Sequence, residues 1–118
     1  MFRFEELEIW KKGICYAEKC YSIASKFPDI ERYALSDQLR RAAVSIPTNI
    51  AEGSGGTEKE FCSFLSIAAR SCLETVSLLT VAEKQKYITM IERIELYGAA
   101  EELVRKIRAM RRFYLDRQ

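Results

Sequence analysis

Residues that break helices are scarce in this sequence and gather at a few points. The 118 residues include two prolines and five glycines, and Pro28, Gly53 and the pair Gly55-Gly56 mark the ends of long segments. Within those segments apolar residues recur at alternating steps of three and four, which is the spacing of one face of an α-helix. The sequence therefore predicts an all-α protein with at least two-thirds of its residues in helix, against about one-third in an average globular protein.

Four helices are predicted, over residues 4–26, 36–52, 57–84 and from 89 to the C-terminal region. Thr57 with Glu60, and Thr89 with Glu92, have the spacing of the capping box that begins a helix. Ser36 is the expected N-cap of the second helix. Short connections between long helices imply antiparallel neighbours, so we expect an up-down-up-down antiparallel four-helix bundle that forms a single domain over residues 1–118.

Each predicted helix has an apolar stripe that we expect to face the core. The expected core residues are Leu7, Trp10, Ile14, Ala17, Tyr21 and Ala24 in the first helix; Leu39, Ala42, Ala43, Ile46 and Ile50 in the second; Phe61, Phe64, Leu65, Ala68, Cys72, Val76, Leu79 and Ala82 in the third; and Leu96, Ala100, Leu103, Ile107, Met110 and Tyr114 in the fourth. The first helix has a second stripe, formed by Ile9, Tyr16 and Ile23. Two stripes on one helix predict that it is covered on more than one side, which favours an oligomer interface.

Pro47 lies inside the second predicted helix. Proline has no N–H group, so it removes one backbone hydrogen bond and is expected to kink this helix near residues 43–47. Gly53 is the expected end of the helix.

The sequence has no histidine and four cysteines, Cys15, Cys20, Cys62 and Cys72, none of them in a C-x-x-C pair. The absence of histidine excludes serine–histidine and cysteine–histidine catalysis. The cysteine spacing does not match zinc or redox sites, so we expect free thiols that act as small buried or half-buried apolar residues. The sequence thus predicts no enzyme activity, no metal and no cofactor.

The expected location is the cytoplasm, without a membrane partner. No apolar run reaches the roughly 18 residues of a membrane span. The N-terminal residues include the acidic pair Glu5-Glu6 and lack the apolar core of a signal peptide.

Positive charge is concentrated at the C-terminal end. Residues 105–118 contain six basic residues and one acid, a net charge of +5; because the whole chain carries +2, the remaining residues sum to −3. The candidate contacts to an anionic partner are Arg105, Lys106, Arg108, Arg111 and Arg112. Arg105, Arg108 and Arg112 share one helix face by their spacing, and Phe113 and Tyr114 lie beside them. The alternative is a solvated helix end, where basic residues complement the helix dipole.

Arg40 and Arg41 form a second candidate contact, on the second helix. They could bind phosphate, or they could pair with Asp37 or Glu52 or lie in water.

The second helix also carries the string L-R-R-A-A-V-S-I-P-T-N-I-A-E-G, residues 39–53, and its S-I-P-x-N-I-A-E-G part is specific. Together with Leu7-Glu8-Ile9-Trp10-Lys11 and Lys59-Glu60-Phe61, this string resembles the bacterial four helix bundle protein family. That family includes proteins encoded in intervening sequences of 23S ribosomal RNA genes, and the accessory variability determinants of diversity-generating retroelements are related to it. The resemblance implies a cytoplasmic, barrel-like homopentamer without enzyme activity. The retroelement relatives imply nucleic acid and a reverse transcriptase-like protein as partners.

Two functions from different classes therefore remain. The first is a non-enzymatic homo-oligomeric scaffold that binds DNA or RNA through basic surface residues. The second is a protein–protein adaptor whose basic surface binds an acidic protein partner.

Overall fold

The computed structural model describes all 118 residues, and it contains four α-helices and no strand. The helices are α1 (Glu8–Ala24), α2 (Leu35–Ser54), α3 (Glu58–Lys84) and α4 (Met90–Leu115), preceded or joined by the short 3₁₀ helices η1 (Arg3–Glu6) and η2 (Asp29–Glu31). The α-helices have 17, 20, 27 and 26 residues, which is more than two-thirds of the chain. The all-α prediction is confirmed.

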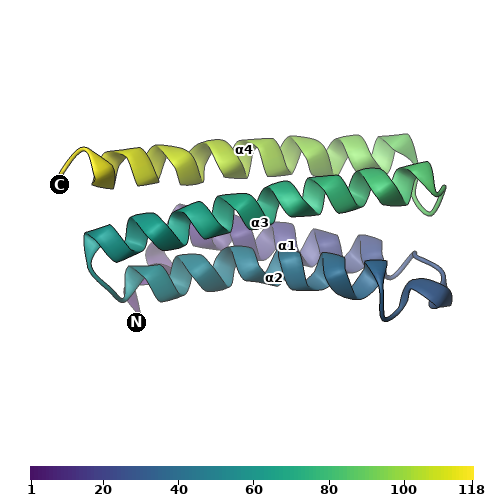
Figure 1. Cartoon of the computed structure of the whole chain (residues 1–118), viewed down its shortest axis with the longest axis horizontal. Coiled ribbons are helices and arrows are strands. Elements are labelled where there is room, and N and C mark those ends of the chain that lie inside the picture. The colour runs from purple at the N-terminus through teal and green to yellow at the C-terminus, as the bar shows by residue number, and fades with distance from the viewer.

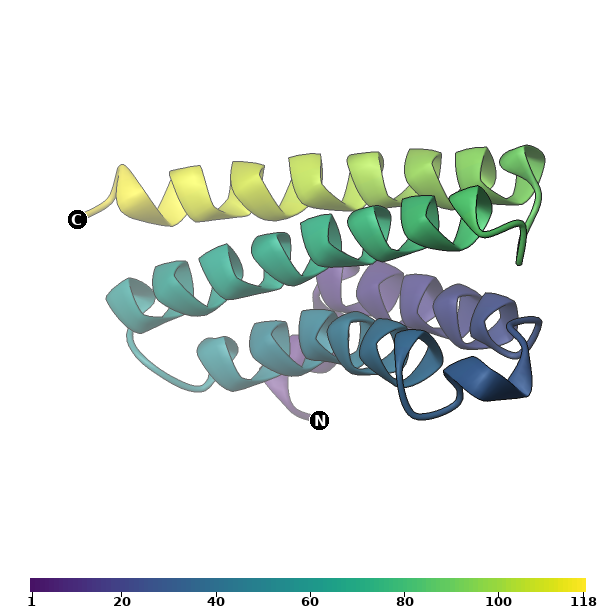
Figure 2. The same ribbon diagram turned by 45° about the vertical axis from the view of Figure 1, so that its right-hand side comes forward.

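Consecutive helices run in opposite directions and lie side by side in an elongated bundle of 46 × 22 × 20 Å (Figures 1 and 2). The helix α2 packs against α1 and α3, and α4 packs against α3 and α1. Thus α2 and α4 occupy diagonal corners of the bundle. Both chain termini lie towards the same end, where α4 finishes (Figure 1).

All four helices contribute to one core of 27 buried apolar residues. Leu39, Ala43, Ile46 and Ile50 of α2 are completely inaccessible to solvent, as are Leu65 of α3 and Ile107 of α4. The stripes expected on α2, α3 and α4 face this core, except that Phe64, Val76, Met110 and Tyr114 are only half-buried.

Both predicted capping boxes are present and set the starts of α3 and α4. The Glu60 N–H donates to Thr57 Oγ1 at 3.1 Å, and the Thr57 N–H donates to Glu60 Oε1 at 2.8 Å. Thr89 and Glu92 exchange the equivalent bonds at 3.1 and 2.9 Å. Each cap satisfies N–H groups that have no partner inside the helix, a contribution of about 1 kcal/mol.

The start of α2 differs from the prediction. Ser36 is not the N-cap: the helix begins at Leu35, whose N–H donates to Glu31 Oε1 at 3.3 Å, and Ser36 lies buried inside the first turn. A carboxylate from the preceding η2 thus accepts from the first N–H group of a helix that begins one residue earlier than predicted. The end of α2 lies at Ser54, so Gly53 is part of the helix.

The two apolar stripes of α1 both contribute to the core. Ile9, Tyr16 and Ile23 of the second stripe are buried, as are Ala17 and Ala24 of the first, and Leu7 and Trp10 pack against the core. The first stripe differs from the prediction at Ile14 and Tyr21, which are 37% and 46% exposed. The positions of α2 and α4 around α1 decide which residues of the two stripes are covered. The helix also starts later than residue 4, because Leu7 is extended and separates η1 from α1.

The helix α2 continues through Pro47, and the kink expected there stays a prediction. Pro47 is buried against α1 at Gly13, where a Cβ would lie 3.5 Å from the Pro47 Cβ atom. A methyl group at Gly13 would therefore be in ordinary van der Waals contact with Pro47.

The helix α3 is long and apolar enough to cross a membrane by length and composition, with a mean hydropathy of 1.4 in its most apolar window. Almost half of that window (44%) is buried inside the bundle, as in the core helix of a folded domain.

Gly53 marks the tightest contact between α2 and α3. A Cβ at this position would lie 2.5 Å from the Phe64 Cβ atom and 3.0 Å from Phe61 Cδ1. Gly98, in the middle of α4, is the opposite case, because a Cβ there would meet nothing within 4 Å.

We predict opposite effects for alanine at these two glycines. Gly53→Ala should lower the free energy of unfolding by about 1–3 kcal/mol through overpacking. Gly98→Ala should raise it by about 0.5–1 kcal/mol, because alanine is the better helix former. Urea unfolding at one fixed protein concentration measures both changes. A Gly53→Ala protein as stable as the wild type would contradict the close packing of α2 on α3.

Candidate nucleic-acid interface

The seven basic residues predicted as contacts fall on two helices that do not adjoin. Arg40 and Arg41 lie on α2, whereas Arg105, Lys106, Arg108, Arg111 and Arg112 lie on α4. Because α2 and α4 occupy diagonal corners, the fold does not bring the two groups together into one surface.

The two arginines of α2 have neighbours within the chain. Arg41 Nε lies 2.9 Å from Asp37 Oδ2, so the expected pairing with Asp37 is present. The guanidinium carbon of Arg40 lies 5.8 Å from the centroid of the Tyr21 ring on α1, within cation–π range. Both groups are therefore engaged in local contacts on the α1/α2 side.

Two of the five basic residues of α4 connect it to neighbouring helices. Lys106 Nζ lies 2.8 Å from Glu8 Oε1 on α1, and this hydrogen bond and positive charge hold the pKa of Glu8 below its usual value. Arg111 Nε donates to the Cys62 carbonyl oxygen of α3 at 3.1 Å.

Arg117, which follows α4, has a similar role. Its Nη2 lies 3.0 Å from Glu58 Oε1, and its guanidinium lies over the rings of Phe113 and Tyr114 at 5.3 and 5.7 Å. Three of the six C-terminal cations thus hold α4 against the bundle.

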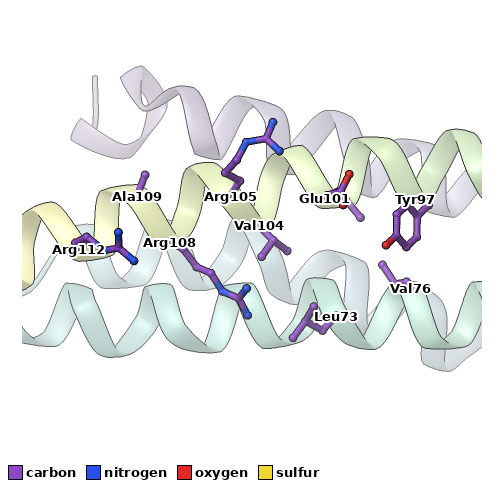
Figure 3. Close-up of a pocket in the computed structure, with 10 residues that line it drawn as sticks. Leu73, Val76, Tyr97, Glu101, Val104, Arg105, Arg108, Ala109 and Arg112 are labelled. Carbon is purple, nitrogen blue, oxygen red and sulfur yellow. The ribbon is translucent and has the colours of Figure 1, made fainter.

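Arg105, Arg108 and Arg112 are exposed and form no ion pair or hydrogen bond with another residue of the chain. The charge of Arg105 adds slightly to the lowering of the pKa of Glu102, which is caused mainly by the hydrogen bond and charge of Lys12. The spacing places the three arginines on neighbouring turns of α4, but the side chains of Arg105 and Arg108 extend to different sides of the helix (Figure 3).

The three arginines line a groove of about 620 Å³ between α3 and α4 (Figure 3). Arg108 extends across the groove towards α3, whereas Arg105 lies on the other side of α4. The other lining residues are mostly apolar: Leu73, Val76, Tyr97, Ala100, Glu101, Val104 and Ala109. The groove therefore combines unpaired positive charge with an apolar floor.

The sequence interpretation missed the apolar part of this groove. Val76 was expected in the core, and Leu73 and Tyr97 were not selected at all. Leu73 is 47% and Tyr97 45% exposed. The spacing of Tyr97, Val104 and Arg108 on one side of α4 was a signal, but only the position of α3 turns that face into a groove.

The four cysteines all have free thiols, and no group of three or more His, Cys, Asp or Glu side chains is arranged to hold a metal ion. Cys20, Cys62 and Cys72 are buried as expected, whereas Cys15 is exposed on α1. Burial raises the pKa of Cys20 and of Cys72 to about 12. Near Cys20, Tyr16 Oη lies 2.7 Å from Thr75 Oγ1. The Thr75 hydroxyl donates to the Cys72 carbonyl oxygen at 2.6 Å, so both buried hydroxyl groups have hydrogen-bond partners.

Two comparisons with known proteins identify relatives. A family model described as 23S rRNA-intervening sequence protein matches residues 5–109. The chain belongs to this family. A crystal structure of a protein of unknown function from the S23 ribosomal protein family of Bacteroides thetaiotaomicron VPI-5482 is similar in fold, with a TM-score of 0.80 at 20% sequence identity. The similarity covers 86% of this chain and 96% of that one. No curated protein matches the chain.

We predict that the thiols differ sharply in reactivity. The thiolate is the reacting form, so at pH 8 iodoacetamide should modify Cys15 first and leave Cys20 and Cys72 unmodified while the protein is folded. Intact-mass spectrometry should find one rapid adduct in the native protein and four in urea. Cys15→Ser is the control, and it should remove the rapid adduct. Equal labelling rates at Cys15 and Cys20 would contradict the buried position of Cys20.

Proposed function

We propose that this chain is a non-enzymatic homo-oligomeric scaffold that binds nucleic acid through phosphate contacts from α4. The observation that supports this proposal is the set of three exposed guanidinium groups, Arg105, Arg108 and Arg112, that have no acidic partner in the chain. Arginine donates hydrogen bonds in a planar fork that suits phosphate oxygens.

The proposed interface is narrower than the one predicted from sequence. Lys106 and Arg111 hold α4 to Glu8 and to the Cys62 carbonyl, so binding a phosphate would require them to leave these partners. Arg40 and Arg41 lie on the far corner of the bundle. The contacts are therefore assigned first to Arg105, Arg108 and Arg112, with the other four residues as secondary contacts.

Self-assembly is part of the proposal, and exposed apolar residues support it. Ile14 and Tyr21 of α1 remain exposed on the stripe expected to be covered, and Ile91 and Ile94 of α4 are 72% and 52% exposed. Exposed apolar groups that gather on a surface are typical of protein interfaces. The family resemblance gives five as the number of subunits. A ring of subunits would repeat the arginine surface and convert weak single contacts into avid binding.

The family resemblance also supplies the wider setting of the proposal. We propose on this basis that the scaffold acts in the cytoplasm without a membrane partner, and that a reverse transcriptase-like protein is a candidate further partner. Phosphate contacts carry no base information, so DNA and RNA are both candidate ligands.

A second candidate function is an adaptor for an acidic protein partner. The apolar floor of the groove favours it, because Leu73, Val76 and Val104 lie beside the three arginines. An amphipathic helix with acidic residues at one end would match both properties of the groove.

We predict that binding to random-sequence DNA or RNA depends on α4 and on salt. Replacing Arg108 and Arg112 with glutamine should weaken binding and reduce the log–log salt slope by up to about 0.9 for each duplex phosphate that is no longer neutralised. The same double replacement at Arg40 and Arg41 is the matched control, because it removes equal charge from α2, and it should have the smaller effect. Fluorescence anisotropy over a salt series measures both.

If the wild-type protein binds neither DNA nor RNA at low salt, the nucleic-acid proposal fails. Binding of an acidic amphipathic peptide under the same conditions would then support the adaptor function.

We predict that the purified protein is a homopentamer. Native mass spectrometry at micromolar concentration should give five subunits, and Ile14→Lys should shift the distribution towards smaller species, because it places a charge in the exposed apolar surface. Thr48→Lys adds a charge at an exposed position of α2 and serves as the control. A wild-type protein found only as a monomer would reject this assembly.

A further inference from the structure

The apolar floor of the α3/α4 groove is not explained by phosphate contacts alone. A duplex keeps its bases paired and stacked inside, so its outer surface offers mainly phosphates and sugars to such a groove. Leu73 and Tyr97 would then remain about half exposed beside the bound duplex. An unpaired strand, in contrast, carries phosphates on one side and flat apolar base surfaces on the other.

The two kinds of lining residue are separated along the groove. Tyr97 lies at one end with Val76 opposite it on α3, Leu73 lies nearer the middle, and the cations Arg108 and Arg112 lie towards the other end (Figure 3). Tyr97 and Arg112 are fifteen residues apart on α4, a distance of about 22 Å at 1.5 Å per residue. The groove thus has room for several nucleotides.

We propose that the α3/α4 groove binds an unpaired strand of nucleic acid, with bases against Tyr97 and the apolar floor and phosphates on Arg108 and Arg112. This inference rests on the proposed function and names the form of nucleic acid that the site prefers. A positively charged groove with aromatic groups on which bases stack is the common design of single-strand binding surfaces.

Glu101 adds a negative charge to the tyrosine end of the groove. It lies between Tyr97 and Arg105 in the order of α4, it lines the groove, and it forms no ion pair with a basic residue. Its negative charge disfavours a phosphate beside it, so near Tyr97 the base of a nucleotide is expected to face the groove and its phosphate to lie away from Glu101. Replacement of Glu101 by glutamine removes this repulsion while keeping the size of the side chain.

The experiment compares three probes that differ only in their bases. They are a mixed-sequence single-stranded oligonucleotide, the same oligonucleotide annealed to its complement, and a strand with the same number of phosphates in which most sites are abasic. Binding of each to the full-length protein at low salt is measured by fluorescence anisotropy. The wild-type protein should bind the intact single strand roughly tenfold more tightly than the abasic strand.

Tyr97→Leu tests the base contact, because leucine keeps an apolar side chain but cannot stack in the same way. It should remove most of the preference for the intact strand over the abasic strand and leave duplex binding unchanged. Tyr33→Leu, at an exposed tyrosine outside the groove, is the matched control and should retain the preference. Glu101→Gln should tighten binding of all three probes.

Each outcome separates this inference from the proposed function. Equal affinity of the wild-type protein for intact and abasic strands, or tighter binding of the duplex, would overturn the single-strand inference and leave nucleic-acid binding in place. Binding of none of the three probes would overturn both. The comparison of strands uses the wild-type protein, so it remains decisive even if Tyr97→Leu fails to fold.

Discussion

Burial of the apolar stripe of α2 is the constraint on which the rest of the bundle depends. Leu39, Ala43, Ile46 and Ile50 are completely inaccessible, and they can be so only because α1 and α3 pack against α2 from two sides. Gly53 permits the close approach of α3, since a Cβ at this position would clash with Phe64. The cost of burying so much of one helix is that little of its surface remains for binding.

The helix α4 has the opposite balance. It buries five of its 26 residues, whereas α2 buries ten of its 20, so a larger share of α4 than of α2 remains at the surface. With so few buried residues, polar contacts help to hold α4 in place: Lys106 with Glu8, Arg111 with the Cys62 carbonyl and Lys12 with Glu102. Exposed ion pairs of this kind contribute little individually, about 0–1 kcal/mol. Their larger consequence is to occupy some cations of the C-terminal cluster and leave Arg105, Arg108 and Arg112 without a partner.

Local features of the fold could be predicted well from the sequence, and features that depend on a neighbouring helix could not. Thr57 and Thr89 cap their helices because each cap involves residues only three positions apart. Ser36 is not a cap because the helix begins before it, at Leu35, where Glu31 from outside the helix accepts from the first N–H group. The exposure of Ile14 has a similar reason: Ile9 and Ile14 both belong to helical patterns, and only the packing of the bundle covers Ile9 and exposes Ile14.

The sequence by itself determined that this chain is helical, where α3 and α4 begin, which family it belongs to, and that its positive charge gathers near the C-terminus. These properties follow from composition, short-range spacing and a motif within one helix, so no tertiary contact is needed to read them. Only the tertiary structure decided which cations are free and what lies beside them. Arg108 and Arg111 are the same residue type and lie less than one helical turn apart on α4. The first extends into the α3/α4 groove with no partner, while the second donates to the Cys62 carbonyl, because the angle at which each leaves α4 places a different part of α3 within its reach.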